Sequence, residues 1–189
     1  SDASLLNAKD EWHTWFIMPA RNATFSGAIK NIAAFTLSYE QIMGRDRLKP
    51  VYYFFPAGYK GFVMLLHGTG GTAQHFVNSY EYKQLIKDLV NDNFGVIVTE
   101  AEESTTGIDA NGDGKIRWNN IPFDSITNVD FANLKIITDT FYNRGVTSRA
   151  KFRYSAGMSN GGNFSASVSY LFSYKAGISY CAPSGNPIA

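Results

Sequence analysis

The chain has 189 residues, of which 44% are hydrophobic and 15% aromatic, and this composition predicts one globular domain rather than a disordered chain. Its 17 basic and 16 acidic residues give a formal net charge of +1 without a basic run, which argues against nucleic acid as a partner. No stretch approaches the ~18 consecutive apolar residues of a membrane span. The charged fraction of 17% lies below the ~25% typical of soluble domains and favours a secreted or periplasmic protein.

Short apolar runs alternate with segments of helical periodicity from about residue 50 onward. This alternation predicts βαβ units and therefore an α/β fold with a mostly parallel sheet flanked by helices. The expected strands are 51–55, 61–67, 95–100, 151–157 and 176–182, and the expected helices are 81–92, 129–143 and a segment within 159–174. In the first 49 residues, edge strands are expected around Trp12, Trp15, Phe16, Ile17 and the run FTLSY (35–39).

The stretch YSAGMSNGG, 154–162, places Ser159 between Gly157 and Gly161 in a G-x-S-x-G pattern. A nucleophile elbow needs a strand before the serine, a helix after it, and small residues two positions away on each side. Both elements are predicted here, and the helix N-terminus would direct N–H groups at developing negative charge. We therefore predict Ser159 as a nucleophile, with a chance match in a strand-helix loop as the alternative.

A second glycine-rich loop, HGTGG at 67–71, follows the predicted buried strand 61–67. An oxyanion hole in such a site is made by the N–H after the nucleophile and by one from an earlier strand-end loop. The candidates are the N–H groups of Asn160 and Thr69. His67 itself is expected to orient the loop through its ring nitrogens rather than to act as a base.

The order of these features along the chain resembles the α/β-hydrolase superfamily. A strand leads into the HG loop, the next strand ends at an acidic residue, and a later strand leads through G-x-S-x-G into a helix. More narrowly, four stretches are similar to the branch of polyhydroxybutyrate depolymerases and feruloyl esterases. They are VMLLHGTGG, RWNNIPF, NVDFANLKIITDTFYNRGV and YSAGMSNGGNFSASVSYLF. The resemblance covers about residues 50–185. It implies a carboxylic ester hydrolase with Ser159 as nucleophile and without an organic cofactor, acting on a small aryl or acyl ester or on a polyester.

The chain departs from that pattern after the elbow. In these hydrolases the triad runs Ser, then Asp or Glu, then His, but no Asp, Glu or His follows Ser159, and the three histidines are residues 13, 67 and 75. We therefore expect the N-terminal portion of a single α/β-hydrolase domain over 1–189. Its parts would be edge strands in 1–49, the central sheet with the elbow in 50–189, and a polar insertion at 101–127.

The missing acid and base are expected on a downstream C-terminal segment or a second polypeptide. Losing a triad member costs ~10⁴ to 10⁶ in rate, so the chain alone should be nearly inert. Two alternatives stay open at this point. One is a non-catalytic, calcium-stabilised binding module that keeps the elbow, and the other is a serine peptidase of the same fold.

The polar insertion contains DANGDGKIRWNN, 109–120, which matches the first half of a calcium loop. The predicted ligands are side-chain oxygens of Asp109, Asn111 and Asp113, the carbonyl of Lys115, and Asn120 where a bidentate Glu is usual. Affinity should therefore be low unless Asp124 completes the shell. The alternative is a pair of Asx turns closed without metal. In either case the loop is expected to present Trp118 near the site, as a residue that contacts substrate.

Overall fold

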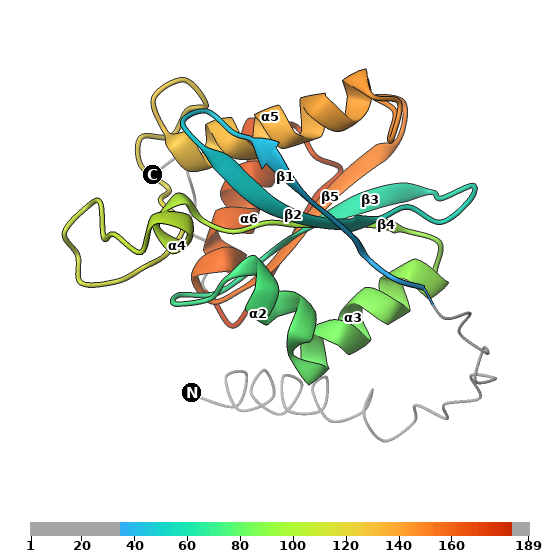
Figure 1. Cartoon of the computed structure of the whole chain (residues 1–189), viewed down its shortest axis with the longest axis horizontal. Helices are drawn as coiled ribbons and strands as arrows, with labels where there is room; N and C mark the ends of the chain where they lie inside the picture. The colour runs from blue at the N-terminus through green and yellow to red at the C-terminus, as the bar shows by residue number, and fades with distance from the viewer. Residues whose placement is uncertain (1–34, 183–189) are drawn as a thin grey trace, which may run out of the picture. The chain divides into compact units, whose positions relative to one another are not determined.

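The computed structural model describes residues 35–182, which form a six-stranded sheet in the order β1-β2-β4-β3-β5-β6 (Figure 1). The strands are β1 (Ser38–Met43), β2 (Leu48–Phe54), β3 (Gly61–Leu66), β4 (Gly95–Val98), β5 (Phe152–Met158) and β6 (Ala176–Tyr180). Strands β3, β4, β5 and β6 run parallel to one another, whereas β2 pairs antiparallel with β4 and with the edge strand β1. The α/β fold class predicted from the alternation of patterns is confirmed.

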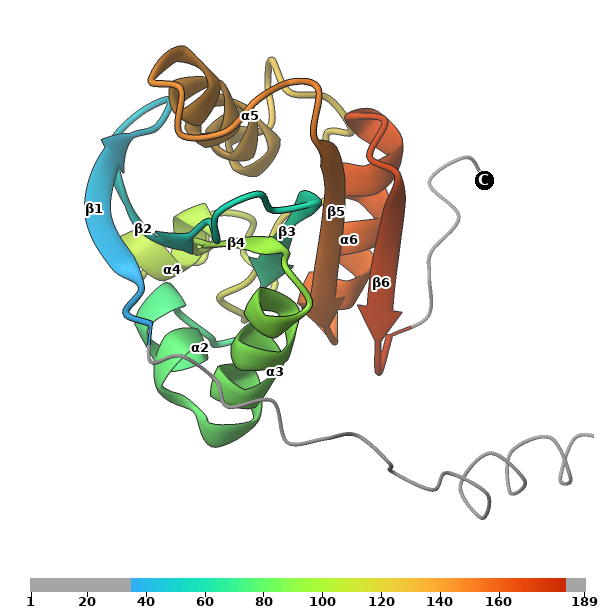
Figure 2. The ribbon, with the colours of Figure 1, turned by 90° about the vertical axis from the view of Figure 1, so that its right-hand side faces the viewer.

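Helices cover both faces of the sheet. They are α2 (Ala73–Asn78), α3 (Tyr80–Asn91), α4 (Glu102–Thr106), α5 (Val129–Asn143) and α6 (Asn160–Leu171). Helices α2 and α3 lie on one side of the sheet, and α5 and α6 on the other (Figure 2). Every residue of β3 and β4 is buried, because a parallel strand covered on both faces has no solvent-facing side.

The expected strands and long helices occur within a few residues of their predicted bounds, and the main differences are the two short helices. Helix α2 follows the HGTGG loop and is capped by Thr72, whose hydroxyl accepts a hydrogen bond from the His75 amide. Helix α4 lies inside the segment expected to be a polar loop, and Gly107 ends it with a φ of 69°. Both are too short to produce a readable helical period.

Within 35–49, the run FTLSY expected as an edge strand overlaps β1 only at Ser38 and Tyr39, and β2 begins three residues before the expected strand. Trp12, Trp15, Phe16 and Ile17 lie outside the described residues. None of the helices between 35 and 182 is long and apolar enough to cross a membrane. Cys181, the only cysteine in the sequence, is exposed directly after β6.

Candidate active site

Ser159 is the single residue between β5 and α6. Its backbone has φ 54° and ψ −125°, a region that a residue with a side chain occupies only under strain. Two neighbours maintain it there: the Ser159 N–H donates to the Tyr180 carbonyl at 2.8 Å, and its own carbonyl accepts from the Gly162 N–H at 2.9 Å. The residue is exposed, so the turn presents the hydroxyl to solvent.

The glycines around Ser159 are required by close backbone packing. A Cβ on Gly157 would lie 2.2 Å from the Gly161 carbonyl oxygen, and one on Gly161 would lie 2.3 Å from the carbonyl oxygens of His67 and Leu66. Real Cβ atoms do not approach oxygen so closely, so strand, helix and HG loop meet only with glycine at these positions. The G-x-S-x-G pattern is thus explained by tertiary packing.

The HGTGG loop lies beside the elbow, since β3 pairs with β5 and Leu66 is in register with Gly157. A Cβ on Gly68 would lie 3.5 Å from the Ser159 Cβ. The Asn160 N–H opens α6 and therefore has no acceptor inside the helix, while Thr69 is exposed on the loop. The structure brings both predicted oxyanion donors to the same strand ends as Ser159.

His67 is held in a neutral form by its two ring nitrogens. Nδ1 lies 2.7 Å from the Gly68 carbonyl and must donate, whereas Nε2 accepts from the Ala101 N–H at 3.0 Å. Burial lowers the pKa of His67 to about 4, against the hydrogen bond to Gly68, which favours the charged form. With both nitrogens committed, the ring orients the loop, as expected, and does not serve Ser159.

The other described histidine, His75, is also committed elsewhere, because its Nε2 lies 3.1 Å from the Ser79 hydroxyl at the end of α2. Among residues 35–182, neither histidine therefore contacts Ser159 as a base.

Trp118 is a core residue in this structure. Its side chain is 1% exposed, its ring stacks on Phe164 at 4.9 Å, and its indole N–H donates to the His67 carbonyl at 3.0 Å. The Asn160 side chain also binds the Trp118 backbone. These contacts support the HG loop; because Trp118 is also among the residues that line the cavity described next, its contact with substrate stays a prediction. No sequence signal distinguished this burial from a place in a cleft.

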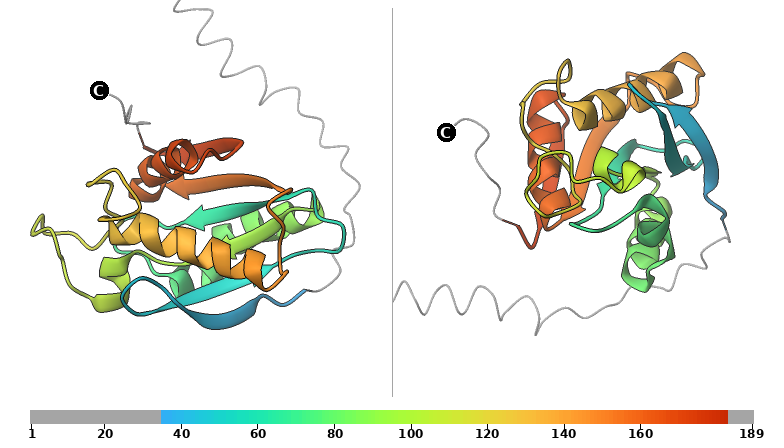
Figure 3. Two further views of the ribbon diagram at one scale, coloured as in Figure 1. Left: turned by 90° about the horizontal axis from the view of Figure 1, so that it is seen from above. Right: turned by 60° about the vertical axis from the view of Figure 1, so that its left-hand side comes forward.

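A cavity of about 520 Å³ lies next to the elbow helix. Its walls come from the polar insertion, from residues 127–129 and from Asn160, the residue after the nucleophile. Five of its twelve lining residues are asparagines, and Ile121, 86% exposed, adds an apolar group. The insertion projects from the end of the sheet at which β4 terminates (Figure 3), where open α/β folds bind ligands.

Buried carboxylates accept hydrogen bonds from the backbone of the insertion, and no sequence motif predicted them. Glu103 accepts from the Ala110 N–H at 3.1 Å and from the Arg117 N–H at 2.9 Å. Asp130, fully buried at the start of α5, accepts from the amides of Asn119 at 2.8 Å and Glu102 at 2.7 Å. Burial raises the pKa of Asp130 to about 6, against the effect of these two hydrogen bonds.

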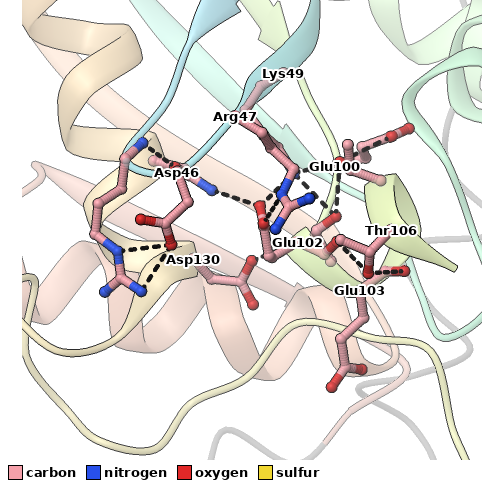
Figure 4. A network of polar contacts seen from close by, with 12 residues as sticks. Asp46, Arg47, Lys49, Glu100, Glu102, Glu103, Thr106 and Asp130 are labelled. Carbon is pink, nitrogen blue, oxygen red and sulfur yellow. Dashed lines mark hydrogen bonds and ion pairs between the residues drawn. The ribbon is translucent and has the colours of Figure 1, made fainter. Parts of the chain in front are cut away.

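The same cluster contains a buried ion pair between Lys49 and Glu102, with Nζ 3.2 Å from Oε2, and Arg47 binds the other carboxylate oxygen (Figure 4). Lys49 is fully buried, and burial lowers its pKa although the Glu102 charge opposes the shift. A buried charge of this kind persists only when it is paired, so the network fixes β2 against the start of α4.

In the predicted calcium loop, backbone N–H groups of the loop donate hydrogen bonds to the side-chain oxygens that were predicted as ligands. Asp109 accepts from the N–H groups of Gly114 at 2.6 Å and Gly112 at 2.8 Å, and these bonds hold its pKa below the usual range. Asn111 accepts from the Asp113 N–H at 3.0 Å, and Asp113 accepts from the Lys115 N–H at 3.0 Å and pairs with Arg117. This is the geometry of the Asx turns that were the alternative.

Two further predicted oxygen donors differ in their contacts. The Asn120 Nδ2 donates to the Asn163 side chain on α6 at 2.8 Å, while the Asn120 Oδ1 is buried and has no hydrogen-bond partner among the described residues. Asp124 accepts from the Thr127 amide at 2.6 Å. Within residues 35–182, no group of three or more His, Cys, Asp and Glu side chains could hold a metal. The residues present therefore offer calcium few free oxygens, and calcium binding stays a prediction.

Comparison with known proteins adds evidence on the fold. No family model and no curated protein matches the chain. An esterase from Pyrococcus furiosus is 14% identical with a TM-score of 0.55, and the match covers 79% of this chain and 53% of that one. A serine hydrolase without lid from Xanthomonas campestris is 12% identical with a TM-score of 0.52, covering 82% and 65%.

The acylaminoacyl peptidase of Pyrococcus horikoshii is likewise similar, at 14% identity and a TM-score of 0.54, with 81% of this chain and 24% of that chain covered. The chain thus spans less than two thirds of the length of each of these three proteins. Their likeness shows that the described residues have the α/β-hydrolase fold.

Proposed function

We propose that the chain is the nucleophile-bearing part of a secreted or periplasmic serine esterase, of the kind represented by polyhydroxybutyrate depolymerases and feruloyl esterases. The observation that carries the proposal is the strained, exposed backbone of Ser159 between β5 and α6, enclosed by glycines that no other residue could replace. Strain of this kind persists only where the surroundings enforce it, and it is concentrated at functional sites.

In the proposed reaction, the Ser159 hydroxyl oxygen attacks the carbonyl carbon of an ester while a base removes the hydroxyl proton. The N–H groups of Asn160 and Thr69 stabilise the negative charge on the former carbonyl oxygen. The tetrahedral intermediate releases the alcohol, which takes the proton from the base. Water, activated by the same base, then hydrolyses the acyl-serine to the carboxylate and free Ser159.

The base in this proposal comes from outside the described residues, because both described histidines are committed to other contacts. A downstream segment or second polypeptide carrying His and Asp would supply it. Calcium, if it binds the 109–120 loop, would act only as a structural ion that stiffens one wall of the cavity beside Asn160.

A fluorophosphonate probe tests the proposal, because it reacts with serine only when the hydroxyl is activated. We expect faint labelling of the chain alone, strong labelling when it is joined to or mixed with the segment that follows it, and none in Ser159→Ala. Hydrolysis of p-nitrophenyl acetate should follow the same order. Equal labelling of wild type and Ser159→Ala under every condition would instead support the non-catalytic binding module.

The second candidate, a peptidase, is favoured by the similarity to an acylaminoacyl peptidase. It uses the same nucleophile, so substrate pairs decide between the two. An acyl ester and the matching acyl p-nitroanilide, compared at equal concentration, should give faster turnover of the ester by an esterase; comparable turnover of the anilide would indicate the peptidase.

A further inference from the structure

A second, smaller pocket lies at the opposite end of the sheet from Ser159. It has a volume of about 160 Å³, and α5, the start of β5 and the segment after α6 form its walls. Arg153 in this pocket precedes Ser159 by six residues, which at ~3.3 Å per strand residue separates the two by roughly 20 Å. The pocket is therefore distinct from the catalytic site.

The pocket carries an excess of positive charge. Its ionisable lining consists of three cations, Lys135, Arg149 and Arg153, together with one carboxylate, Asp139, and two tyrosines. Asp139 already accepts from both Lys135 and Arg149, each at 2.7 Å. Arg153 has no carboxylate partner among the ion pairs formed by residues 35–182, so one guanidinium lacks a counter-charge.

Aromatic rings fix both guanidinium groups. The Arg149 Cζ lies 4.5 Å from the centre of the Tyr142 ring, and the Arg153 Cζ lies 5.1 Å from that of Tyr174. A guanidinium stacked on a ring keeps its N–H edge available for a planar or tetrahedral oxyanion. The cations are thus placed before any ligand arrives, which lowers the entropy cost of binding.

The Tyr142 hydroxyl is the second feature of this pocket that points to a ligand. Its oxygen is buried and close to the Arg153 guanidinium, which can only donate to it, and the hydroxyl proton has no acceptor among the described residues. A buried hydroxyl whose proton has no acceptor costs about 1–3 kcal/mol, so such groups normally mark a bound water, ion or ligand. Burial raises the pKa of Tyr142, against the charges of Arg153 and Arg149 and the hydrogen bond from Arg153, so the phenol keeps its proton and can donate.

We propose that this pocket binds a small oxyanion, either a short carboxylate or phosphate, which accepts hydrogen bonds from Arg153 and from the Tyr142 hydroxyl. The volume of about 160 Å³ is several times the ~30 Å³ that one water occupies in the liquid, which suits such an anion and is too small for a nucleotide. The site is a binding site remote from Ser159 and takes no part in the proposed ester hydrolysis.

The test is a titration of the full chain with sodium phosphate and, separately, with sodium acetate, at ionic strength held constant with sodium chloride. Side-chain Nε–H resonances of arginine, followed by ¹⁵N NMR, report on Arg149 and Arg153 directly. We expect saturable shifts with half-saturation in the millimolar range, and the anion that saturates at lower concentration identifies the preferred ligand.

Three variants complete the test. Arg153→Gln should weaken binding roughly tenfold or more, because a charge-assisted hydrogen bond is lost. Tyr142→Phe, which leaves the net charge unchanged, should weaken it severalfold. Arg45→Gln, which removes an equal charge at an exposed ion pair with Asp46, should bind as wild type does.

Shifts that stay linear in anion concentration for both anions would overturn the proposal, as would equal weakening by Arg45→Gln and Arg153→Gln. If Arg153→Gln fails to fold, Tyr142→Phe decides: unchanged binding by that variant contradicts the proposed site.

Discussion

The side-chain amide of Asn160 forms a pair of hydrogen bonds with the backbone of Trp118. Its oxygen accepts from the Trp118 N–H at 2.9 Å, and its nitrogen donates to the Trp118 carbonyl at 3.1 Å. The residues are 42 positions apart, and the pair connects the residue after the nucleophile to the polar insertion. The wall of the large cavity and the proposed oxyanion donor are therefore one hydrogen-bonded unit.

Asn160→Ala should loosen this unit. The change removes both hydrogen bonds and leaves two Trp118 backbone groups unpaired, so the free energy of unfolding should fall by about 1–3 kcal/mol. In a Trp12→Phe, Trp15→Phe background, Trp118 fluorescence should shift to longer wavelength as the ring gains water. Urea unfolding measures the first effect and emission spectra the second.

Asn143→Ala is the matched control, because Asn143 is exposed at the end of α5. It should change stability by less than about 0.5 kcal/mol. If Asn160→Ala is as stable as this control and its emission is unchanged, the pair contributes nothing to the position of the insertion.

Substitution of Gly157, at the strand end of the elbow, by alanine should be more damaging than the same substitution of a glycine that is needed only for its backbone angle. Gly157→Ala places a Cβ 2.2 Å from the Gly161 carbonyl oxygen and forces backbone to move. Overpacking of this kind costs typically 1–3 kcal/mol, and a displaced Ser159 should also lose reactivity towards fluorophosphonate.

Gly58 provides the comparison, since it has a φ of 69° and open space around the added Cβ. Gly58→Ala should cost about 1–2 kcal/mol through strain alone and should leave Ser159 labelling unchanged. Equal labelling of both variants would contradict the close-packing explanation of the elbow.

His67 should make the protein sensitive to acid. Its pKa falls from 6.5 to about 4 on folding, so the native state binds fewer protons than the unfolded state between these pH values. The stability that the neutral ring provides is present above pH 6.5 and is lost as the pH falls towards 4. At 1.36 kcal/mol per unit, the loss attributable to His67 is about 3 kcal/mol.

Asp130 acts in the opposite direction over nearly the same range, because its pKa rises from 3.8 to about 6 on folding and acid therefore favours the native state. The useful quantity is thus the difference in unfolding free energy between wild type and His67→Gln, measured in urea at pH 7, 5 and 4. It should shrink as the pH falls; a difference that stays constant with pH would show that His67 is not buried as a neutral ring.

Calcium should bind the 109–120 loop weakly if it binds at all. Of the predicted carboxylate ligands, Asp113 is already paired with Arg117, and Asp109 and Asp124 accept hydrogen bonds from nearby amides. We expect a dissociation constant on the order of 10⁻⁴–10⁻³ M by calorimetry, the range of weak calcium sites. Asp109→Asn should abolish the heat, and the exposed Asp92→Asn should not. Absence of heat in wild type would establish the metal-free Asx turns.

Local patterns in the sequence determined the central strands, the long helices, the elbow and the HG loop. Continuous apolar runs, a 3.6-residue period and glycines at fixed offsets are properties of a few neighbouring residues, and β3, α5 and the turn at Ser159 satisfy them locally. The short helices α2 and α4 were not predicted, because a helix of one or two turns is too short to show a helical period in the sequence.

Only the tertiary structure decided which polar residues support the site. Three hydrogen-bonded pairs show this, because the sequence does not indicate that their members meet. They are Asn160 with Trp118, Glu103 with Arg117, and Asp130 with Asn119. Trp118 is the clearest case: an exposed substrate contact and a buried support have the same sequence signature. Burial and long-range hydrogen bonds depend on how the elements pack, and packing is a property of the whole chain rather than of a short stretch.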